Sequence, residues 1–452
     1  MLIGLLLPVF FILPARAQAL TLNIAVNQAK LNFPDSIQFV LSSTSPTTIQ
    51  KVSLIYGTSA ESCVSSSARQ EVDFKASNTV NANWTWDLSQ SGDLPPGASV
   101  WWQWEVQDDT GGTFTSAAKQ LTIQDPNFSW QKLQQGVLTV YWSRGNAAFG
   151  KMIMDVGVSS LDRLTKSAGI QPPDQIQLTI YPNSDAMKNA APFLPEWTGG
   201  VAFSEYNSVL IGIAPGQDSW AAQAIPHELA HLVTNKRTYN CLGNSMPTWL
   251  NEGLSVFNQG PTSQTDKDLV LQALKNDRLP PLASLANGFA ATTKLADLDY
   301  AESGMLVSYM IESLGANKMD TLLGTIQQGH AADTALQEVF GLDTKALDLT
   351  WRSSLGYGVA PNPSVFKASA TVQTTAIPTL ALWSPLTTPS TTPAPVITPA
   401  AQNTQIVQPT LPPSTSSEPV ASPFWLYVGF SVIVILSIIM ILILIYVYKI
   451  LK

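Results

Sequence analysis

The sequence is poor in charged residues, in histidine and in cysteine. Charged residues make up 12% of the 452 residues and hydrophobic residues 45%, so the folded part can bury a sizeable core. Basic residues are not in excess, because the formal net charge is −8. This balance argues against a nucleic-acid partner, which normally needs a basic face. The length is enough for two or three domains, and we find no internal repeat.

The N-terminus lacks the Lys or Arg that usually precedes the apolar run of a signal peptide. Residues 2–13 are nevertheless apolar, and Ala15, Ala17 and Ala19 follow in the A-x-A pattern of a cleavage site. This pattern predicts a signal peptide over residues 1–19. The alternative is a buried N-terminal strand.

The C-terminal part of the chain has hardly any charge. Residues 359–423 are rich in Pro, Thr and Ser and cannot bury a core, which predicts a disordered linker. Residues 424–448 carry no charged side chain and would form roughly 38 Å of helix, enough to cross a bilayer. Lys449 and Lys452 follow, which predicts a cytoplasmic tail over residues 449–452. Together with the signal peptide, this predicts a single-pass cell-membrane protein with its larger part outside the cell.

The rest of the chain shows two patterns. Residues 20–124 contain many short alternating segments separated by turns, which predicts an all-β, immunoglobulin-like or fibronectin-type sandwich. Residues 125–358 begin with strands and continue with helices, which predicts an α+β domain. The expected strands include 37–42, 51–56, 175–181 and 208–214, and the expected helices include 151–167, 223–235, 247–258 and 300–314.

The two cysteines lie far apart in the sequence, at Cys63 and Cys241. In an oxidising compartment such a pair is a candidate disulfide. It would join the N-terminal domain to the second domain. Two free buried thiols are the alternative, because a sequence does not show whether the two side chains meet.

Two of the three histidines stand four residues apart, in His227-Glu228-Leu229-Ala230-His231. Residues four apart lie on the same face of a helix, so both imidazoles can reach one metal ion. Glu228 lies beside them, where it can take a proton from an activated water. The alternative is a pair of ordinary surface histidines, but random placement would give this pattern roughly once in a thousand cases. His330 has the setting of a helix-end or loop residue.

Catalytic zinc needs a third protein ligand and an open fourth position. The segment Trp249-Leu250-Asn251-Glu252-Gly253 contains an acidic residue in an apolar stretch. A buried carboxylate needs a partner, and a metal ion provides one. Glu252 is therefore the expected third ligand, and an exposed helix carboxylate is the alternative.

These two motifs resemble those of the gluzincin metallopeptidases, which include thermolysin-like and aminopeptidase N-like enzymes. The likeness is strongest to the bacterial peptidase MA-like domains, over about residues 125–358. It implies that His227, His231 and Glu252 bind one zinc ion and that Glu228 is the general base. It also implies that Tyr300, at the start of a helix, stabilises the oxyanion, with Tyr309 as the competing candidate.

The resemblance has two further implications for substrate binding. Residues 208–214 resemble the edge strand with which these enzymes pair an extended peptide. The Gly-x-Met-x-Asn motif of the aminopeptidases is absent, and Gly199-Gly200-Val201-Ala202-Phe203 stands at about its place. This departure makes aminopeptidase activity less expected.

The sequence therefore predicts a membrane-anchored, extracellular zinc metallopeptidase that acts on a protein or peptide substrate. The leading alternative is a catalytically inactive, zinc-binding surface adhesin or receptor. A zinc hydrolase acting on a non-peptide bond is a third interpretation. The substrate and the oligomeric state do not follow from the sequence.

Overall fold

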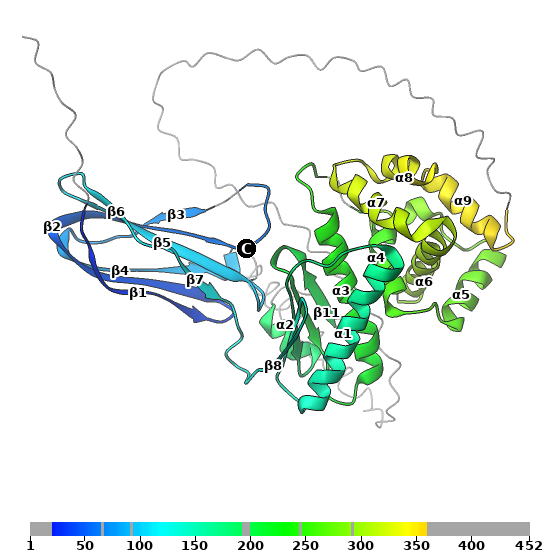
Figure 1. Ribbon diagram of the computed structural model, residues 1–452, viewed down its shortest axis with the longest axis horizontal. Coiled ribbons are helices and arrows are strands. Elements are labelled where there is room, and N and C mark those ends of the chain that lie inside the picture. Colours follow the sequence, from blue (N-terminus) through cyan, green and yellow to red (C-terminus); the bar gives the residue numbers. More distant parts are fainter. Residues whose placement is uncertain are drawn as a thin grey trace, which may run out of the picture. The chain divides into compact units, whose positions relative to one another are not determined.

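A computed structural model describes residues 20–64, 67–90, 94–191, 199–243, 246–290 and 293–358 (Figure 1). The predicted signal peptide, linker, transmembrane helix and cytoplasmic tail lie outside these residues. Within the described ranges, no helix is both long enough and apolar enough to cross a bilayer.

The N-terminal part of the structure is built of β-strands. Its seven strands are connected by hydrogen bonds into one sheet: β1 (Asn23–Asn32), β2 (Ser36–Thr58), β3 (Ala68–Glu71), β4 (Ser77–Asp87), β5 (Ser99–Asp108), β6 (Thr113–Thr115) and β7 (Lys119–Thr122). All of the strand pairs are antiparallel. A β-rich N-terminal domain is thus present, as the sequence predicts.

Strand β2 connects two groups of strands. Its first half, up to Thr44, pairs with β1 and β4, whereas its second half, from Ile49, pairs with β3 and β5. The register shifts between Thr44 and Ile49. The expectation of two separate strands at 37–42 and 51–56 is therefore wrong, because both segments belong to the single strand β2. The pairing is compatible with a two-layer sandwich, whose core contains Phe39, Leu54 and Trp104.

The second domain begins with a five-stranded sheet of order β11-β12-β10-β9-β8 (Figure 1). Its strands are β8 (Gln131–Gln135), β9 (Leu138–Trp142), β10 (Ile176–Tyr181), β11 (Gly200–Phe203) and β12 (Ser208–Gly212). The β9-β10 and β10-β12 pairs are parallel, and both outer pairs are antiparallel. The expectation that residues 208–214 form the edge strand is therefore wrong. The edge strand is β11, because it adds to the free side of β12.

The second domain also contains helices, of which the first two lie between strands of the sheet in the chain and the rest follow its last strand. These are α1 (Ala147–Ala168), α2 (Ser184–Ala190), α3 (Asp218–Thr238), α4 (Thr248–Gln259), α5 (Gln264–Lys275), α6 (Thr293–Tyr309), α7 (Ala316–Gln327), α8 (Ala332–Phe340) and α9 (Thr344–Ser354). Both α1 and α3 pack on the strands, and one continuous apolar core joins the sheet to the helices behind it. An α+β arrangement is the result.

Helix α3 begins at Asp218, earlier than the expected start at residue 223, and it contains Pro226. A proline in a helix leaves the carbonyl four residues earlier without its usual donor. That carbonyl belongs to Ala222, which is exposed to solvent. The carbonyl of Pro226 itself accepts a hydrogen bond from the Asn258 side chain at 2.8 Å.

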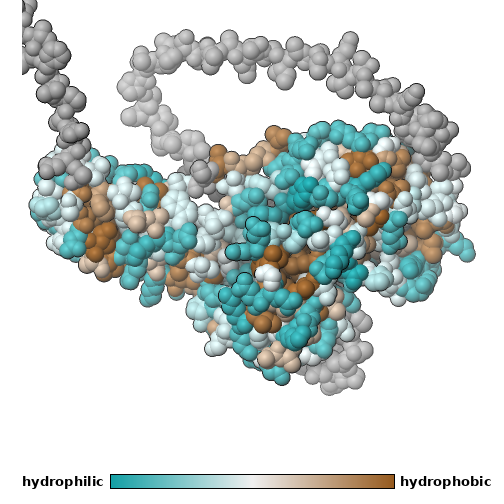
Figure 2. Space-filling view, in the orientation of Figure 1, coloured by the Kyte–Doolittle hydropathy of each residue, from teal (hydrophilic) through white to brown (hydrophobic). Residues whose placement is uncertain are grey.

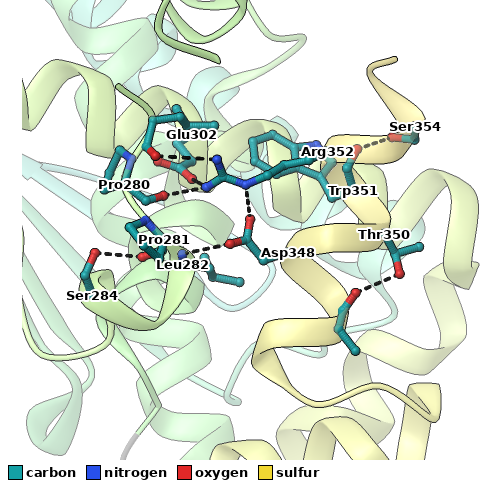
Figure 3. A network of polar contacts seen from close by, with 12 residues as sticks. Pro280, Pro281, Leu282, Ser284, Glu302, Asp348, Thr350, Trp351, Arg352 and Ser354 are labelled. Atoms are coloured by element: carbon teal, nitrogen blue, oxygen red, sulfur yellow. Dashed lines mark hydrogen bonds and ion pairs between the residues drawn. The ribbon is translucent and has the colours of Figure 1, made fainter. Parts of the chain in front are cut away.

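A buried polar network fastens the last helix to the centre of the domain (Figure 3). Arg352 on α9 donates to Asp348 at 2.6 Å and to the carbonyl of Pro280 at 2.6 Å, and it lies 3.4 Å from Glu302 on α6. Asp348 also accepts from the backbone N–H of Leu282 at 3.2 Å. These bonds hold α9 to α6 and to the segment before α6 that contains Pro280 and Leu282.

The outer surface is mixed in character. On the face shown in Figure 2, hydrophobic residues form separate groups among hydrophilic ones. Large exposed hydrophobic side chains include Val64, Leu242 and Leu295. Surface scatter of this kind is ordinary and does not define an interaction site.

Candidate metal centre

Two helices bring the predicted ligands together. His227 and His231 lie one turn apart on α3, and Glu252 projects from α4. Their Nε2 atoms are 3.1 Å apart, and each is 3.4 Å from Oε2 of Glu252. All three side chains are buried, with at most 5% of any residue exposed. The structure therefore gathers these three residues, which are separated in sequence, at one point.

The donor atoms have the spacing that a zinc ion requires. Three ligands of a tetrahedral zinc, each at about 2.0–2.1 Å, lie about 3.4 Å from one another. The three observed separations are 3.1, 3.4 and 3.4 Å. Within the described part of the chain, Oε2 of Glu252 has no hydrogen-bond partner although it is buried. A carboxylate oxygen in this condition, facing two imidazole nitrogens, fits a divalent metal ion.

The outer nitrogens of both imidazoles also have partners, and α4 supplies both. Nδ1 of His231 is 3.1 Å from Oδ1 of Asn251, and Nδ1 of His227 is 2.8 Å from Nε2 of Gln259. Contacts of this kind orient a metal-binding histidine and leave its Nε2 facing the ion. The metal-binding pattern of the sequence does not single out Asn251 or Gln259. The position of Asn251 beside Glu252 was a usable signal, whereas the contact of Gln259 depends on the packing of two helices.

Glu228 is the buried acid beside the ligands. It is fully buried, and neither of its carboxylate oxygens has a hydrogen-bond partner among the described residues. Burial raises the pKa of Glu228 to about 8, because the anion is poorly solvated there. Gly200 on β11 makes room for this carboxylate, since a Cβ at that position would lie 2.8 Å from Cγ of Glu228.

Burial and mutual charge shift the pKa values of the three ligand side chains in different directions. Burial lowers the pKa of His227, which favours the neutral imidazole that binds a metal. Burial acts the same way on His231, but the carboxylates of Glu252 and Glu228 outweigh it and raise the pKa of His231. Burial alone would disfavour the anion of Glu252, yet both imidazoles lower the pKa of Glu252 to about 2. A proton therefore competes with a metal ion at His231 in acid.

Tyr300 lies near the metal ligands. Its ring centre is 6.2 Å from that of His227, and the ring of Phe289 packs against it edge-on at 4.8 Å. The expectation that Tyr300 begins a helix is wrong, because α6 starts at Thr293. Tyr309, the competing candidate, packs against the apolar core.

His330 lies apart from this group. It is exposed in part, and its Nδ1 is 3.1 Å from Glu338. This is a surface pair, in keeping with the loop or helix-end position that the sequence indicates. The metal-ligand cluster of the described residues contains the other two histidines and not His330.

Helices α4 and α6 approach each other closely enough to set the distance between Glu252 and Tyr300. A Cβ on Gly253 would lie 2.5 Å from the backbone oxygen of Ser303, and a Cβ on Gly304 would lie 2.4 Å from Val256. Only glycine permits such an approach at these positions. The two glycines therefore allow the close packing of α4 against α6 beside the site.

A disulfide joins the β-rich domain to the loop between the two ligand helices. Cys63 and Cys241 are bonded, with their Cα atoms 5.5 Å apart. The disulfide that the sequence left open against two free thiols is thus present. Close by, Lys236 on α3 lies 2.9 Å from Glu61 in an ion pair.

A comparison with protein families finds a match over the part of the chain that contains this site. A sequence model of the peptidase MA superfamily matches residues 157–357, which carry all of the candidate ligands. No curated protein matches the chain.

Several solved metallopeptidases are similar at low identity. An M1 zinc metallopeptidase from Deinococcus radiodurans is 9% identical with a TM-score of 0.32, covering 77% of this chain and 96% of that one. An aminopeptidase N family protein from Idiomarina loihiensis is 12% identical with a TM-score of 0.33, covering 73% of this chain and 72% of that one. Aminopeptidase A from Legionella pneumophila is 10% identical with a TM-score of 0.35, covering 74% of this chain and 48% of that one. TM-scores at this level carry no inference by themselves.

The family match falls on the part of the chain that holds the His-His-Glu cluster. Residues 157–357 are therefore similar to the peptidase MA superfamily, and they hold the three side chains that the gluzincin resemblance predicts as ligands.

Proposed function

We propose that this protein is a zinc peptidase that hydrolyses peptide bonds with His227, His231 and Glu252 as its metal ligands. The observation that carries the proposal is the convergence of two imidazole nitrogens and one carboxylate oxygen within 3.1–3.4 Å of one another. A purely structural zinc site would not need a buried acid beside its ligands. Glu228 is such an acid, which favours a hydrolytic site.

A bound zinc ion would lower the pKa of a water molecule and polarise the scissile carbonyl. Glu228 takes the proton from that water and later delivers it to the leaving amine. The place of Glu228 suits both steps, because its buried carboxylate lies directly beside the proposed zinc ligands. Tyr300 donates its hydroxyl hydrogen to the developing oxyanion, a contribution of about 3 kcal/mol in comparable sites.

The free edge of β11 is the proposed binding place of the peptide backbone. The N–H of Gly212 on β12 donates to the carbonyl of Gly199 at 3.0 Å, so the backbone carbonyl of Gly199 is directed toward β12. Backbone groups alternate in direction along an antiparallel strand. Those of Gly200 and Ala202 therefore point away from β12, where an extended peptide can pair with them.

The proposal includes a location. The apolar run at residues 424–448, followed by Lys449 and Lys452, supports a single membrane-spanning helix with the peptidase part outside the cell. The bond between Cys63 and Cys241 supports an oxidising compartment. The pairing pattern of β2 supports an immunoglobulin-type sandwich for the N-terminal domain.

The test is the substitution Glu228→Gln in the full-length protein. We expect this variant to bind zinc with wild-type affinity and to lose hydrolysis of an unfolded protein substrate at least about 100-fold, because general acid–base catalysis is worth about that much. The matched control is Glu312→Gln, which changes an exposed acid in the short π-helix Met310–Gly315 and leaves hydrolysis unchanged. Undiminished hydrolysis in Glu228→Gln would refute the assigned role. Zinc binding without any hydrolysis by the wild-type protein would favour the inactive zinc-binding receptor instead.

A further inference from the structure

Helix α4 presents a row of polar side chains to the metal-binding helix. Asn251 and Glu252 lie near its start. Asn258 follows Asn251 by seven residues, and Gln259 follows Glu252 by seven. Seven residues make almost two full turns, so all four lie on one side of α4. One of these side chains is a proposed ligand, and the other three contact His231, the carbonyl of Pro226 and His227.

The two imidazoles differ in the atom that faces their outer nitrogen. The outer nitrogen of His231 faces the amide oxygen of Asn251, whereas that of His227 faces the amide nitrogen of Gln259. A neutral imidazole carries one N–H, and binding a metal through Nε2 places that hydrogen on Nδ1. The Nδ1–H group then needs an acceptor. Asn251 already offers one to His231.

The side-chain amide of Gln259 can supply the same acceptor to His227. Turning the amide by 180° exchanges its nitrogen and oxygen at almost unchanged shape. Gln259 is the last residue of α4 and is exposed, so this rotation does not disturb the core. A glutamine therefore suits either position of the hydrogen on His227, donating to Nδ1 in one and accepting from it in the other.

We propose that Gln259 is the positioning residue of His227, turning its amide oxygen toward Nδ1 so that Nε2 is free to bind the metal ion. This inference rests on the proposed zinc site and adds a residue to it. It predicts that the acceptor oxygen matters, and not merely the presence of a side chain.

Three variants of the full-length protein separate these possibilities. Gln259→Leu keeps the bulk and removes the acceptor, Gln259→Glu keeps acceptor oxygens only, and Gln272→Leu changes an exposed glutamine on α5 as a matched control. The dissociation constant of zinc is measured by competition with a chromophoric chelator. The visible spectrum of the cobalt-substituted protein, which responds to ligand geometry, is recorded beside it.

We expect Gln259→Leu to weaken zinc binding about 10–100-fold, the usual cost of losing such a partner, and to change the cobalt spectrum. Gln259→Glu binds zinc at least as tightly as the wild type, and Gln272→Leu does not differ from it. The melting temperature of the metal-free form stays unchanged in all three. Wild-type zinc affinity in Gln259→Leu would overturn the inference, as would equal weakening in Gln259→Leu and Gln259→Glu.

The outcome is independent of whether the protein hydrolyses peptides. If the wild type binds zinc and is inactive, the proposed function fails while the zinc affinities of the variants still decide the role of Gln259. If the wild type binds no zinc, both proposals are refuted.

Discussion

Adding one methyl group at Gly253 tests how closely the two helices of the site are packed. In Gly253→Ala, the new Cβ would lie 2.5 Å from the backbone oxygen of Ser303 and 2.6 Å from Cγ2 of Val307. A carbon and a carbonyl oxygen approach to about 3.3 Å at the closest. The Ser303 oxygen belongs to a helix backbone and cannot rotate away, so α4 and α6 must separate by roughly 0.8 Å.

Two effects of opposite sign determine how much the free energy of unfolding changes in Gly253→Ala. Alanine in place of glycine favours a helix by about 1 kcal/mol. Overpacking against rigid atoms costs about 1–3 kcal/mol, and a backbone contact belongs at the upper end. We therefore expect the free energy of unfolding to fall by about 2 kcal/mol. For a domain of this size that corresponds to a melting temperature lower by about 4–8 °C.

We expect this variant also to hydrolyse substrate more slowly, by more than its lower stability explains. Glu252 lies next to Gly253 on α4, and Tyr300 lies on α6, so the separation moves a proposed ligand away from the proposed oxyanion donor. A displacement of about 1 Å in an active site can cost about 100-fold in rate. The assay is thermal unfolding together with hydrolysis at saturating zinc, which removes any effect of weaker metal binding.

The control is Gly324→Ala on α7. The three atoms nearest to its Cβ belong to the guanidinium group of Arg237, the nearest at 2.6 Å, and this group is the end of a side chain. A smaller loss of stability and no loss of activity are expected there. If Gly253→Ala melts at or above the wild-type temperature and keeps full activity, the close approach of α4 and α6 is not a requirement of the site.

Four further predictions concern other parts of the molecule. Reduction of the Cys63–Cys241 bond lowers the free energy of unfolding by about 2–5 kcal/mol in denaturant titrations, and an unchanged midpoint would contradict its bracing role. Burial raises the pKa of Glu302 from 4.5 to about 8, so the folded protein keeps a proton that the unfolded chain releases in this range. Stability therefore falls as the pH rises from about 4.5 to about 8, and Glu302→Gln flattens this fall in melting curves recorded across the range. Removal of zinc by a chelator lowers the melting temperature, and added zinc restores it, less effectively in acid because the pKa of His231 is raised. Tyr300→Phe lowers kcat about 100-fold with little change in KM, and an unchanged kcat would remove Tyr300 from the reaction.

Local spacing in the sequence was sufficient for the parts of the site that one helix carries. His227 and His231 are four residues apart, so a helix of any length places them side by side, and Glu228 follows as their neighbour. Glu252 could be named as the third ligand because a carboxylate in an apolar helix needs a partner. The helices were also predictable where their pattern is strong, as at α1 and α4, although their ends shifted by a few residues.

Strand arrangement could not be read in the same way. The expected edge strand at 208–214 is an inner strand, because the short strand β11 just before it in the chain pairs with its outer side. A strand of four residues that itself begins with glycine carries little periodic signal.

The sequence by itself determined the type of chemistry: two imidazoles, a neighbouring acid and a second acid on a later helix, which follow from fixed helical geometry. Only the tertiary structure decided that Glu252 meets both imidazoles, that Gln259 reaches His227, that Gly200 and Gly253 make room for the site, and that Cys63 bonds to Cys241. These contacts join segments far apart in the chain, and their geometry depends on how helices and strands pack, which no local pattern encodes.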